Sequence, residues 1–374
     1  MAAISNSIVH LTMRFGSTVL AIGTGAVYRR DGQHFIVTAW HNVTGLHPDK
    51  MCHLSHERAV PDNIIATMSI SADHGPEGAG FFRLSVVLPL QDDDKALFYI
   101  HPANWPRVDV VAIPFDPEAL HTIEMRLSTG EIRKMTMPLS SENSGATTAV
   151  CPLQNYLLPN AEIAQRWLDC VEVTEELFIP GYPQNIQDYY VQPVWKRATI
   201  ASSVQLGWNG EKKFLIDSAS KSGMSGSPVL YYNSNGEVRI QGSTYHFGQS
   251  AAILAGIYVG RLGVTKDGDP QIGTVWHRAV IDEIIDGKCF ERLPFEIELS
   301  SRELEAAAKE EFVTISREGL ENVKNPEMPS RFYVRTRLME RINGRASPER
   351  ALEAVLNVAE AYDGPFVSDE GHSE

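Results

Sequence analysis

Residues 221–229, with the sequence KSGMSGSPV, carry the clearest chemical signal in the chain. Ser225 stands among small residues just before an apolar run, an arrangement typical of a nucleophile on a tight turn. Small neighbours let a carbonyl group approach the hydroxyl, and the backbone N–H groups of such a turn can converge on its oxygen. A Gly/Ser turn that only joins two strands fits the pattern about equally well. Because a serine hydroxyl needs a base to become nucleophilic, the chemical interpretation requires a histidine and a carboxylate elsewhere.

His41 and Asp109 are the candidates for these two roles. His41 lies in IVTAWHNV, where an apolar run ends and the chain turns, a common place for functional side chains. Asp109 lies in VDVVAIP, and a carboxylate within an apolar run is costly to bury unless it is paired. Taken singly, one of twelve histidines is more often structural, and Asp109 could equally face water at the start of a strand.

Short β-rich runs separated by turn residues surround these candidates. Residues 19–28 and 34–39 are joined through Asp31-Gly32, a strong hairpin signal. A second β-rich block runs from residue 171 to about residue 280, and neither block alternates strands with helices. We therefore expect sandwiches or barrels rather than a parallel sheet.

The pattern becomes helical from about residue 291. Ser300 and Glu303 form a capping box ahead of apolar residues at helical spacing. Ser347 and Pro348 open a second predicted helix, which residues 364–365 (Gly-Pro) should end. Both apolar stripes favour packing faces rather than ligand sites.

Composition restricts the function classes. The 374 residues carry a net charge of −14, with 43% hydrophobic and 21% charged residues, as in ordinary globular proteins of two or three domains. The acidic balance disfavours nucleic acid and anionic membrane as partners. There is no membrane-length apolar stretch and no secretory signal pattern, so we expect a cytoplasmic protein.

The sequence gives no strong indication of a metal or cofactor. The four cysteines are scattered and form no CxxC pair, which favours buried thiols over a disulfide framework. His47, Cys52, His53 and His56 match no zinc spacing well. Asp92–Asp94 is most simply a solvated loop. We expect neither a metal nor a cofactor.

Several segments together resemble the trypsin-like (chymotrypsin-fold) serine proteases. The histidine, aspartate and serine occur in that family's order, and the likeness covers roughly residues 10–280. Within that family, this sequence resembles the bacterial-type trypsin-like peptidases without disulfides. The matching blocks are residues 23–27 (GTGAV), 37–41 (VTAWH), 109–113 (DVVAI), 178–183 (FIPGYP), 196–202 (KRATIAS), 223–229 (GMSGSPV) and 254–260 (LAGIYVG).

This resemblance implies a mainly β fold with two six-stranded antiparallel β-barrels and a cleft between them. Residues 1–115 would form the first barrel and residues 171–288 the second, with residues 116–170 as a connection carrying an insertion. Residues 289–374 lie outside the likeness and would form a helical C-terminal extension.

The resemblance also implies the roles of the site residues in a serine endopeptidase acting on a protein or peptide. His41 would be the general base toward Ser225, and Asp109 would orient the imidazole. The backbone N–H groups of Gly223 and Ser225 would form the oxyanion hole. Ala219, Val259, Gly260 and Arg261 would line the primary substrate pocket. Since Ala219 stands where trypsin has an aspartate, a preference for Lys or Arg is not expected.

Three positions depart from the family pattern. Trp40 replaces a small residue before the histidine, so packing behind the imidazole must differ. Asn42 replaces a cysteine found in many secreted members. Met224 replaces the aspartate of zymogen-activated members, so we expect no trypsin-style activation cleavage.

Two alternatives to a turnover enzyme stay open. The chain could be a catalytically silent protease-fold scaffold, as Trp40 and the appended helices suggest, or a protease that processes only itself or one partner. The extension, residues 291–366, could pack on the second barrel, self-associate or bind a regulatory partner.

Overall fold

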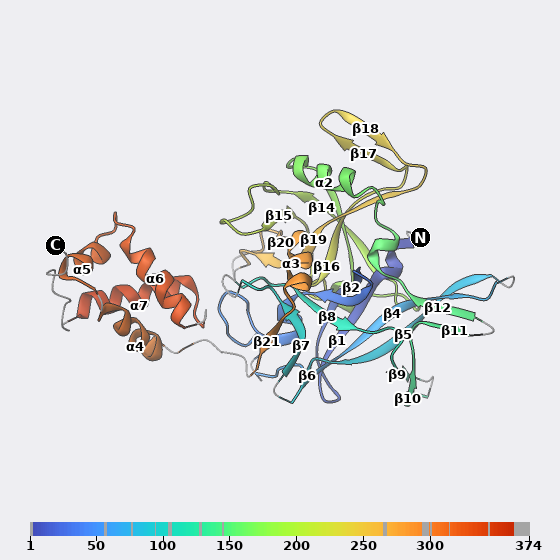
Figure 1. Cartoon of the computed structure of the whole chain (residues 1–374), viewed down its shortest axis with the longest axis horizontal. Coiled ribbons are helices and arrows are strands. Elements are labelled where there is room, and N and C mark those ends of the chain that lie inside the picture. Colours follow the sequence, from blue (N-terminus) through green and yellow to red (C-terminus); the bar gives the residue numbers. More distant parts are fainter. Residues whose placement is uncertain are drawn as a thin grey trace. The chain divides into compact units, whose positions relative to one another are not determined.

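The computed structural model is mainly β, with helices gathered near the C-terminus (Figure 1). It describes residues 3–55, 58–75, 78–93, 95–103, 107–126, 129–143, 146–264, 268–293, 299, 301–313, 315–342 and 345–362. The chain forms two compact units. The first comprises Met1–Gly45, Ala59–Pro102 and Asp109–Arg292, and the second comprises Leu46–Arg58, Ala103–Val108 and Leu293–Glu374. The domain boundaries given by the sequence analysis stay predictions.

The C-terminal half of the first unit contains a closed six-stranded antiparallel barrel, which confirms one of the two predicted barrels. Its strands follow the order β13-β14-β15-β20-β19-β16. They are β13 (Glu176–Gly181), β14 (Val194–Ile200), β15 (Lys213–Asp217), β16 (Ser227–Asn233), β19 (Ala251–Leu262) and β20 (Ile272–His277). A separate ribbon pairs β17 (Glu237–Ile240) with β18 (Ser243–His246).

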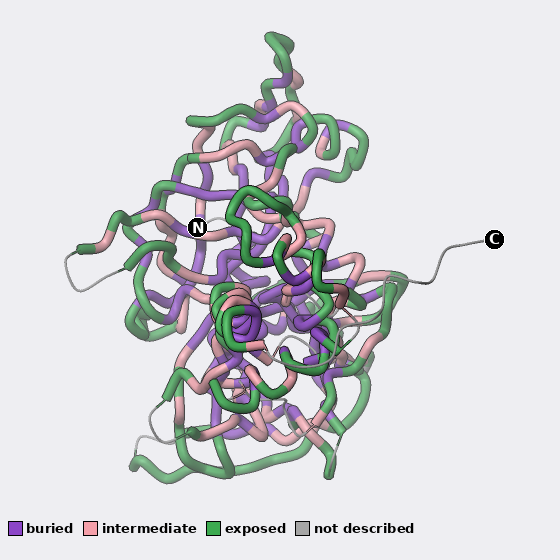
Figure 2. Tube along the Cα trace, turned by 90° about the vertical axis from the view of Figure 1, so that its left-hand side faces the viewer, coloured by how far each residue is buried: buried purple, intermediate pink, exposed green. Residues whose placement is uncertain are grey.

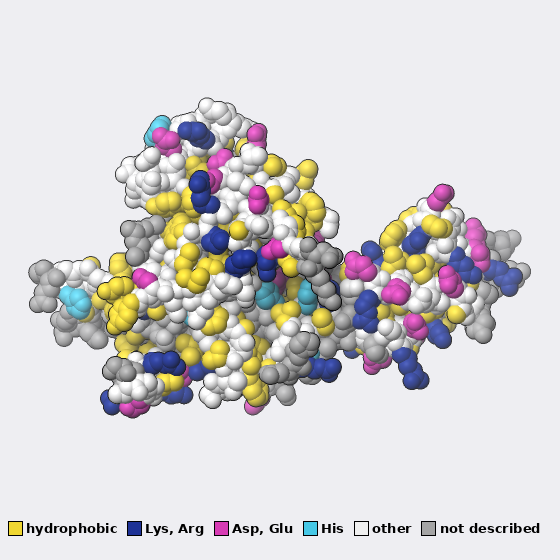
Figure 3. Space-filling model, turned by 180° about the vertical axis from the view of Figure 1, so that it is seen from behind, with side chains coloured by type: hydrophobic (Ala, Val, Ile, Leu, Met, Phe, Trp, Pro, Cys, Tyr) yellow, Lys and Arg dark blue, Asp and Glu magenta, His cyan; other side chains and the backbone are white. Residues whose placement is uncertain are grey.

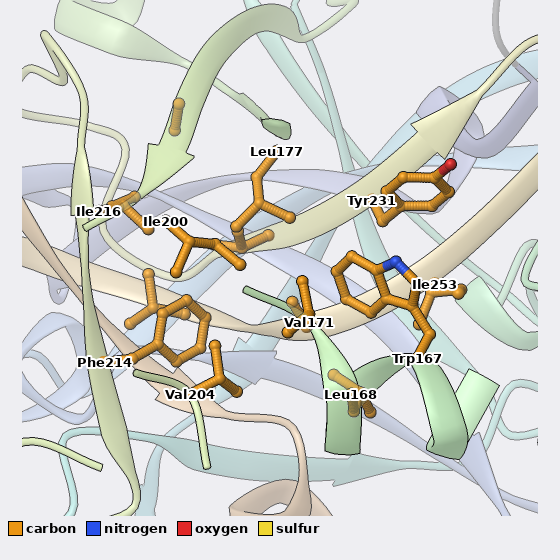
Figure 4. Close-up of a cluster of buried hydrophobic side chains, with 14 of the residues drawn as sticks. Trp167, Leu168, Val171, Leu177, Ile200, Val204, Phe214, Ile216, Tyr231 and Ile253 are labelled. Atoms are coloured by element: carbon orange, nitrogen blue, oxygen red, sulfur yellow. The ribbon is translucent and has the colours of Figure 1, made fainter. Parts of the chain in front are cut away.

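Alternating apolar residues of these strands fill the barrel, where helix α2 (Ala161–Cys170) adds Trp167 and Leu168. Figure 4 shows the Trp167 indole beside the Tyr231 ring; their centroids are 4.9 Å apart. Burial of these large apolar surfaces is the main source of the barrel's stability. Figure 2 shows buried residues along the inner segments of the chain and exposed residues along the outer ones.

The N-terminal half forms an open sheet of thirteen strands among the described residues, with β10 at one end of its main path and β21 at the other. The main path runs β10-β9-β5-β4-β1-β2-β3-β8-β7-β21. Its strands are β1 (Ile8–Phe15), β2 (Thr18–Arg30), β3 (Gln33–Thr38), β4 (Asn63–Asp73), β5 (Ala79–Pro89), β6 (Gln91–Asp92), β7 (Lys95–Ile100), β8 (Val111–Phe115), β9 (His121–Arg126), β10 (Ile132–Met137), β11 (Ser141–Asn143), β12 (Ala146–Val150) and β21 (Cys289–Arg292). Short 3₁₀ turns are η1 (Ala3–Ser7), η3 (Leu153–Asn155) and η4 (Pro183–Asn185).

A second six-stranded barrel is therefore not confirmed. Among the described residues no ladder joins β7 to β4 or β5, which would close the ring. Both β4 and β5 are 11 residues long, and β5 pairs with β9 while β4 pairs with β12. The β9 ladder occupies the outer edge of β5, and β12 continues the edge of β4 that pairs with β1, so the sheet extends beyond a six-stranded ring. The predicted hairpin is confirmed: Arg30 pairs with Gln33, and Asp31 and Gly32 both have positive φ.

The second unit contains the predicted C-terminal helices and two more. They are α4 (Ser301–Phe312), α5 (Arg317–Lys324), α6 (Ser330–Arg341) and α7 (Pro348–Ala361), packed around Phe312, Leu338 and Val355. Ser347 caps α7 by accepting a hydrogen bond from the Arg350 N–H, as predicted. Ser300 and residues 364–365 lie outside the described residues. No helix in the described part of the chain is long and apolar enough to cross a bilayer.

Charged side chains of both signs are interspersed on the face shown in Figure 3. The four cysteines are free thiols. In the described ranges no three His, Cys, Asp or Glu side chains gather closely enough to hold a metal ion, and His56 lies outside those ranges.

Candidate active site

The His41 imidazole is fixed by Asp109. His41 lies in the five-residue helix α1 (Trp40–Thr44), which follows β3, and Asp109 precedes β8. The ring Nδ1 lies 2.8 Å from Asp109 Oδ2 and 3.1 Å from Oδ1, and the backbone N–H of His41 donates to Oδ1 at 2.9 Å. The carboxylate thus holds the hydrogen on Nδ1, which leaves Nε2 as the basic nitrogen.

The electrostatics of this pair strengthen the base. Burial by itself lowers the pKa of His41, because it penalises the charged ring. The negative charge of Asp109 and its hydrogen bond outweigh burial, and the pKa of His41 lies above its ordinary value. Asp109 itself is only 5% exposed, so its charge acts on the imidazole with little screening.

Ser225 lies on the loop that leads into β16, between two glycines that the surroundings require. Gly223 has φ +91° and Gly226 has φ +89°. A Cβ on Gly226 would lie 2.0 Å from the Thr24 carbonyl oxygen, and one on Gly223 would lie 2.3 Å from that of Tyr182. The loop is therefore pressed against neighbouring backbone and cannot accept side chains at either glycine.

The peptide groups around Ser225 leave two donors unused. The Ser222 carbonyl accepts a hydrogen bond of 2.6 Å from the Gln184 N–H, so the N–H of Gly223 points to the opposite side of that trans peptide. Within the described residues neither the Gly223 N–H nor the Ser225 N–H donates to another protein group. Two free donors beside a serine hydroxyl are suited to binding an oxyanion.

The hydroxyl of Ser225 donates to the Val259 carbonyl at 3.1 Å. Among the hydrogen bonds of the described residues, none joins the His41 ring to Ser225. A hydrogen bond from Ser225 to His41 would therefore require the serine side chain to rotate away from Val259.

Asn42 is a site residue whose function the sequence analysis missed. Its Nδ2 donates to the Ser225 carbonyl at 2.9 Å and to Thr38 Oγ1 at 3.0 Å. The Thr24 N–H donates to the same Ser225 carbonyl at 2.9 Å. A Cβ on Gly23 would lie 2.6 Å from Asn42 Nδ2, so the glycine makes room for the amide. The residue next to His41 thus bridges directly to the residue proposed as nucleophile.

The predicted pocket residues lie in different environments. Val259 is buried beside Ser225, and Gly260 follows it on β19 with partial exposure. Ala219 is exposed and its carbonyl accepts from Lys196 Nζ at 2.6 Å. The Arg261 guanidinium is ion-paired with Asp269.

Two further residues near the predicted pocket were missed. The Tyr258 hydroxyl and Ser220 Oγ are 2.5 Å apart, and both residues are buried. A Cβ on Gly273 would lie 2.7 Å from the Tyr258 ring, which shows how closely the ring packs against β20. Met224 packs into the barrel core. An aromatic residue within an apolar strand gives no signal in the sequence that would predict this buried contact.

The chain is weakly similar to solved protease structures. An inactive form of Rv3671c from M. tuberculosis H37Rv shares 13% identity over 76% of this chain and 88% of that one, with a TM-score of 0.34. The active form of the Rv3671c protease from M. tuberculosis shares 14% identity over 76% of this chain and 82% of that one, with a TM-score of 0.35. The serine endoprotease from Yersinia pestis shares 11% identity over 76% of this chain and 62% of that one, with a TM-score of 0.35. No family model and no curated protein matches this chain.

Proposed function

We propose that this chain is a serine endopeptidase that hydrolyses peptide bonds of a protein or peptide substrate through His41, Asp109 and Ser225. The observation that carries the proposal is the imidazole fixed by a buried carboxylate, in a chain segment hydrogen-bonded to the loop of a glycine-flanked serine. The low-similarity neighbours are not needed for this inference, which depends on the chain's own geometry. No metal or cofactor takes part in the proposed reaction.

Each step of the proposed reaction is assigned to a group described above. His41 Nε2 takes the hydroxyl proton as Ser225 Oγ attacks the carbonyl carbon of the substrate. The resulting oxyanion accepts hydrogen bonds from the Gly223 and Ser225 N–H groups, and each such donor is worth roughly 3–4 kcal/mol in comparable enzymes. Asp109 stabilises the imidazolium, which gives its proton to the leaving amine. Water then attacks the acyl-enzyme by the same sequence and releases the free serine.

The hydrogen bond from Ser225 to Val259 favours the alternative of a catalytically silent module. A neutral hydrogen bond of this kind contributes only about 0.5–1.5 kcal/mol. Rotation of the hydroxyl toward His41 is therefore a small part of a catalytic barrier, and the proposed enzyme is the better interpretation. Self-processing, and self-association or regulation through residues 291–366, stay predictions.

Labelling by a fluorophosphonate probe tests the proposal, because the probe forms a covalent bond only with an activated serine. We expect the wild-type chain to be labelled, Ser225→Ala to be unlabelled and His41→Ala to be labelled far more slowly. Ser227→Ala is the matched control and should be labelled, since Ser227 lies two residues from the nucleophile inside β16. Absence of labelling in folded wild type, or equal labelling of Ser225→Ala, would contradict the proposal.

A further inference from the structure

Trp40, the residue directly before His41, has a buried polar partner. Its side chain is completely buried, and its indole Nε1–H donates to Glu291 Oε2 at 2.7 Å. Glu291 is only 6% exposed. A hydrogen bond to a carboxylate in such an environment is strong and directional, so it restrains the orientation of the indole.

Glu291 comes from a distant part of the chain. It lies in β21, which follows the closed barrel and helix α3 (Ala279–Gly287) in the chain. Strand β21 pairs antiparallel with β7, with Phe290 opposite Tyr99 and their ring centroids 4.7 Å apart. Figure 1 shows β21 beside β7 at the edge of the N-terminal sheet. The strand brings a carboxylate to the helix that carries His41.

The helix that carries His41 depends on such anchors. Helix α1 has five residues, and Ala39 at its N-cap provides no side-chain hydrogen bond. A single turn of helix is not stable without tertiary contacts. Asp109 holds the backbone N–H of His41, while Glu291 holds the adjacent indole. The second carboxylate oxygen of Glu291 accepts from the Arg292 N–H at 3.0 Å, which fixes the carboxylate on its own strand.

We propose that Glu291 is a positioning residue for the hydrolytic site: through Trp40 it sets the orientation of α1, and thereby the alignment of the His41 imidazole with Asp109 and Ser225. The proposal depends on the proposed function for its kinetic consequences. Its structural claim, that Glu291 controls the His41–Asp109 hydrogen bond, stands without turnover. Strand β21 is then part of the active-site scaffold although it follows both halves of the protease-like region.

Kinetics of full-length variants test the coupling. We expect Glu291→Leu to lower kcat on a peptide substrate about tenfold or more, with KM within about twofold, since a small displacement of a catalytic group is costly. Glu291→Gln keeps an acceptor for the indole and should retain most of the activity. Trp40→Phe keeps a large ring without the donor and should resemble Glu291→Leu. The double variant Trp40→Phe/Glu291→Leu should be no slower than either single variant, because both remove the same hydrogen bond.

A spectroscopic readout separates positioning from general stability. The proton on His41 Nδ1, hydrogen-bonded to Asp109, should give a downfield proton resonance that shifts or broadens in Glu291→Leu and is restored in Glu291→Gln. Glu311→Leu is the matched control, because Glu311 is a buried glutamate in α4 that pairs with Arg337 and Arg341 in the second unit. It should lower thermal stability and leave both kcat and the resonance unchanged.

Two results would overturn the proposal: wild-type kcat with an unchanged His41 resonance in Glu291→Leu, or fully additive losses in the double variant. If Glu291→Leu does not fold, Trp40→Phe removes the same hydrogen bond from the other side, and wild-type kcat with an unchanged His41 resonance in that variant would overturn the proposal. If the wild type neither hydrolyses peptides nor labels, the proposed function fails, while the resonance still decides whether Glu291 positions His41.

Discussion

The two β-structures of the first unit differ in closure: one is a closed barrel and the other is an open sheet. The barrel that carries Ser225 closes on itself, so each of its six strands has a hydrogen-bonded neighbour on both sides within residues 176–277. The sheet that carries His41 is open, and one of its edges is the short strand β21. Open edges must be covered or shortened to avoid non-native pairing, whereas a barrel has none.

Because of this difference, the proposed nucleophile and the proposed base depend on the rest of the chain in different ways. The Ser225 loop is shaped mainly by glycines and by backbone contacts that the barrel and β2 supply. The His41 helix is held by carboxylates: Asp109 from the start of β8, and Glu291 from a strand about 250 residues later. The Ser225 loop should therefore be sensitive to added atoms, and the His41 helix should be sensitive to loss of the acceptors that hold it.

Removing the charge of Asp109 should cause the largest loss of activity, because His41 depends on that carboxylate. Asp109→Asn keeps the shape of the side chain but presents an amide that favours the wrong imidazole tautomer, and we expect kcat to fall by about 10⁴. The variant should remain folded, because the backbone N–H of His41 still finds an oxygen acceptor. The measurement is steady-state hydrolysis with fluorophosphonate labelling. Asp92→Asn, at an exposed strand, is the control and should match wild type.

Adding one carbon to Gly226 should break the nucleophile side. An alanine there would place Cβ 2.0 Å from the Thr24 carbonyl oxygen and 2.2 Å from Thr38 Oγ1, at a φ of +89°. We expect the loop to shift, with a loss of about 1–3 kcal/mol of folding free energy and labelling slowed by about 10²-fold or more. Gly248→Ala is the control, because nothing lies within 4 Å of the added carbon. Normal labelling of folded Gly226→Ala would show that the loop tolerates displacement.

The local features of the active site were predictable from the sequence, because they depend on residues close together in the chain. The Asp31-Gly32 hairpin follows from turn chemistry, and β2 and β3 pair across it. The glycines around Ser225 indicate a tight turn, and in the structure neighbouring backbone indeed lies close to Gly223 and Gly226. The order of the three candidate residues, together with the resemblance, predicts a triad from the sequence.

The non-local features were not predictable in the same way. Strand β10 has exposed side chains at five of its six positions, so it shows no alternating pattern that would distinguish it from a loop. Strand β21 has four residues and pairs with β7 across about 190 positions of sequence. In the sequence Glu291 is one acidic residue among many, and only its buried contact with Trp40 distinguishes it. The open N-terminal sheet results from such pairings.

Changes in pH should alter kcat/KM through His41, with a smaller effect than either substitution. His41 must be neutral to accept the Ser225 proton, so kcat/KM should fall as pH decreases through the His41 pKa, about tenfold per pH unit below it. Because Asp109 holds this pKa above the ordinary value of 6.5, the midpoint should lie above 6.5. In Asp109→Asn the residual activity should have a lower midpoint. A wild-type midpoint below 6.5 would contradict the dominance of Asp109 over burial.

The raised pKa of His41 makes folding stability change with pH in the direction opposite to activity. A histidine whose pKa is raised on folding stabilises the native state fully only below its unfolded pKa, and that contribution is lost as pH rises through the folded pKa. Wild type should thus lose a small part of its stability over the pH interval in which it gains activity. Thermal melting across this interval should show the loss in wild type and a smaller one in His41→Ala.

The smallest effect should come from Asn42, because it joins the two halves without carrying charge. Asn42→Ala removes the hydrogen bonds to the Ser225 carbonyl and Thr38 Oγ1, while the Thr24 N–H still holds that carbonyl. We expect labelling to slow by roughly threefold to tenfold and stability to fall by about 1 kcal/mol. Asn42→Asp retains the size but opposes the carbonyl with a negative charge, so it should be worse than alanine. If aspartate is instead the better tolerated substitution, Asn42 fills space beside Gly23 and does not hold the nucleophile loop through its N–H.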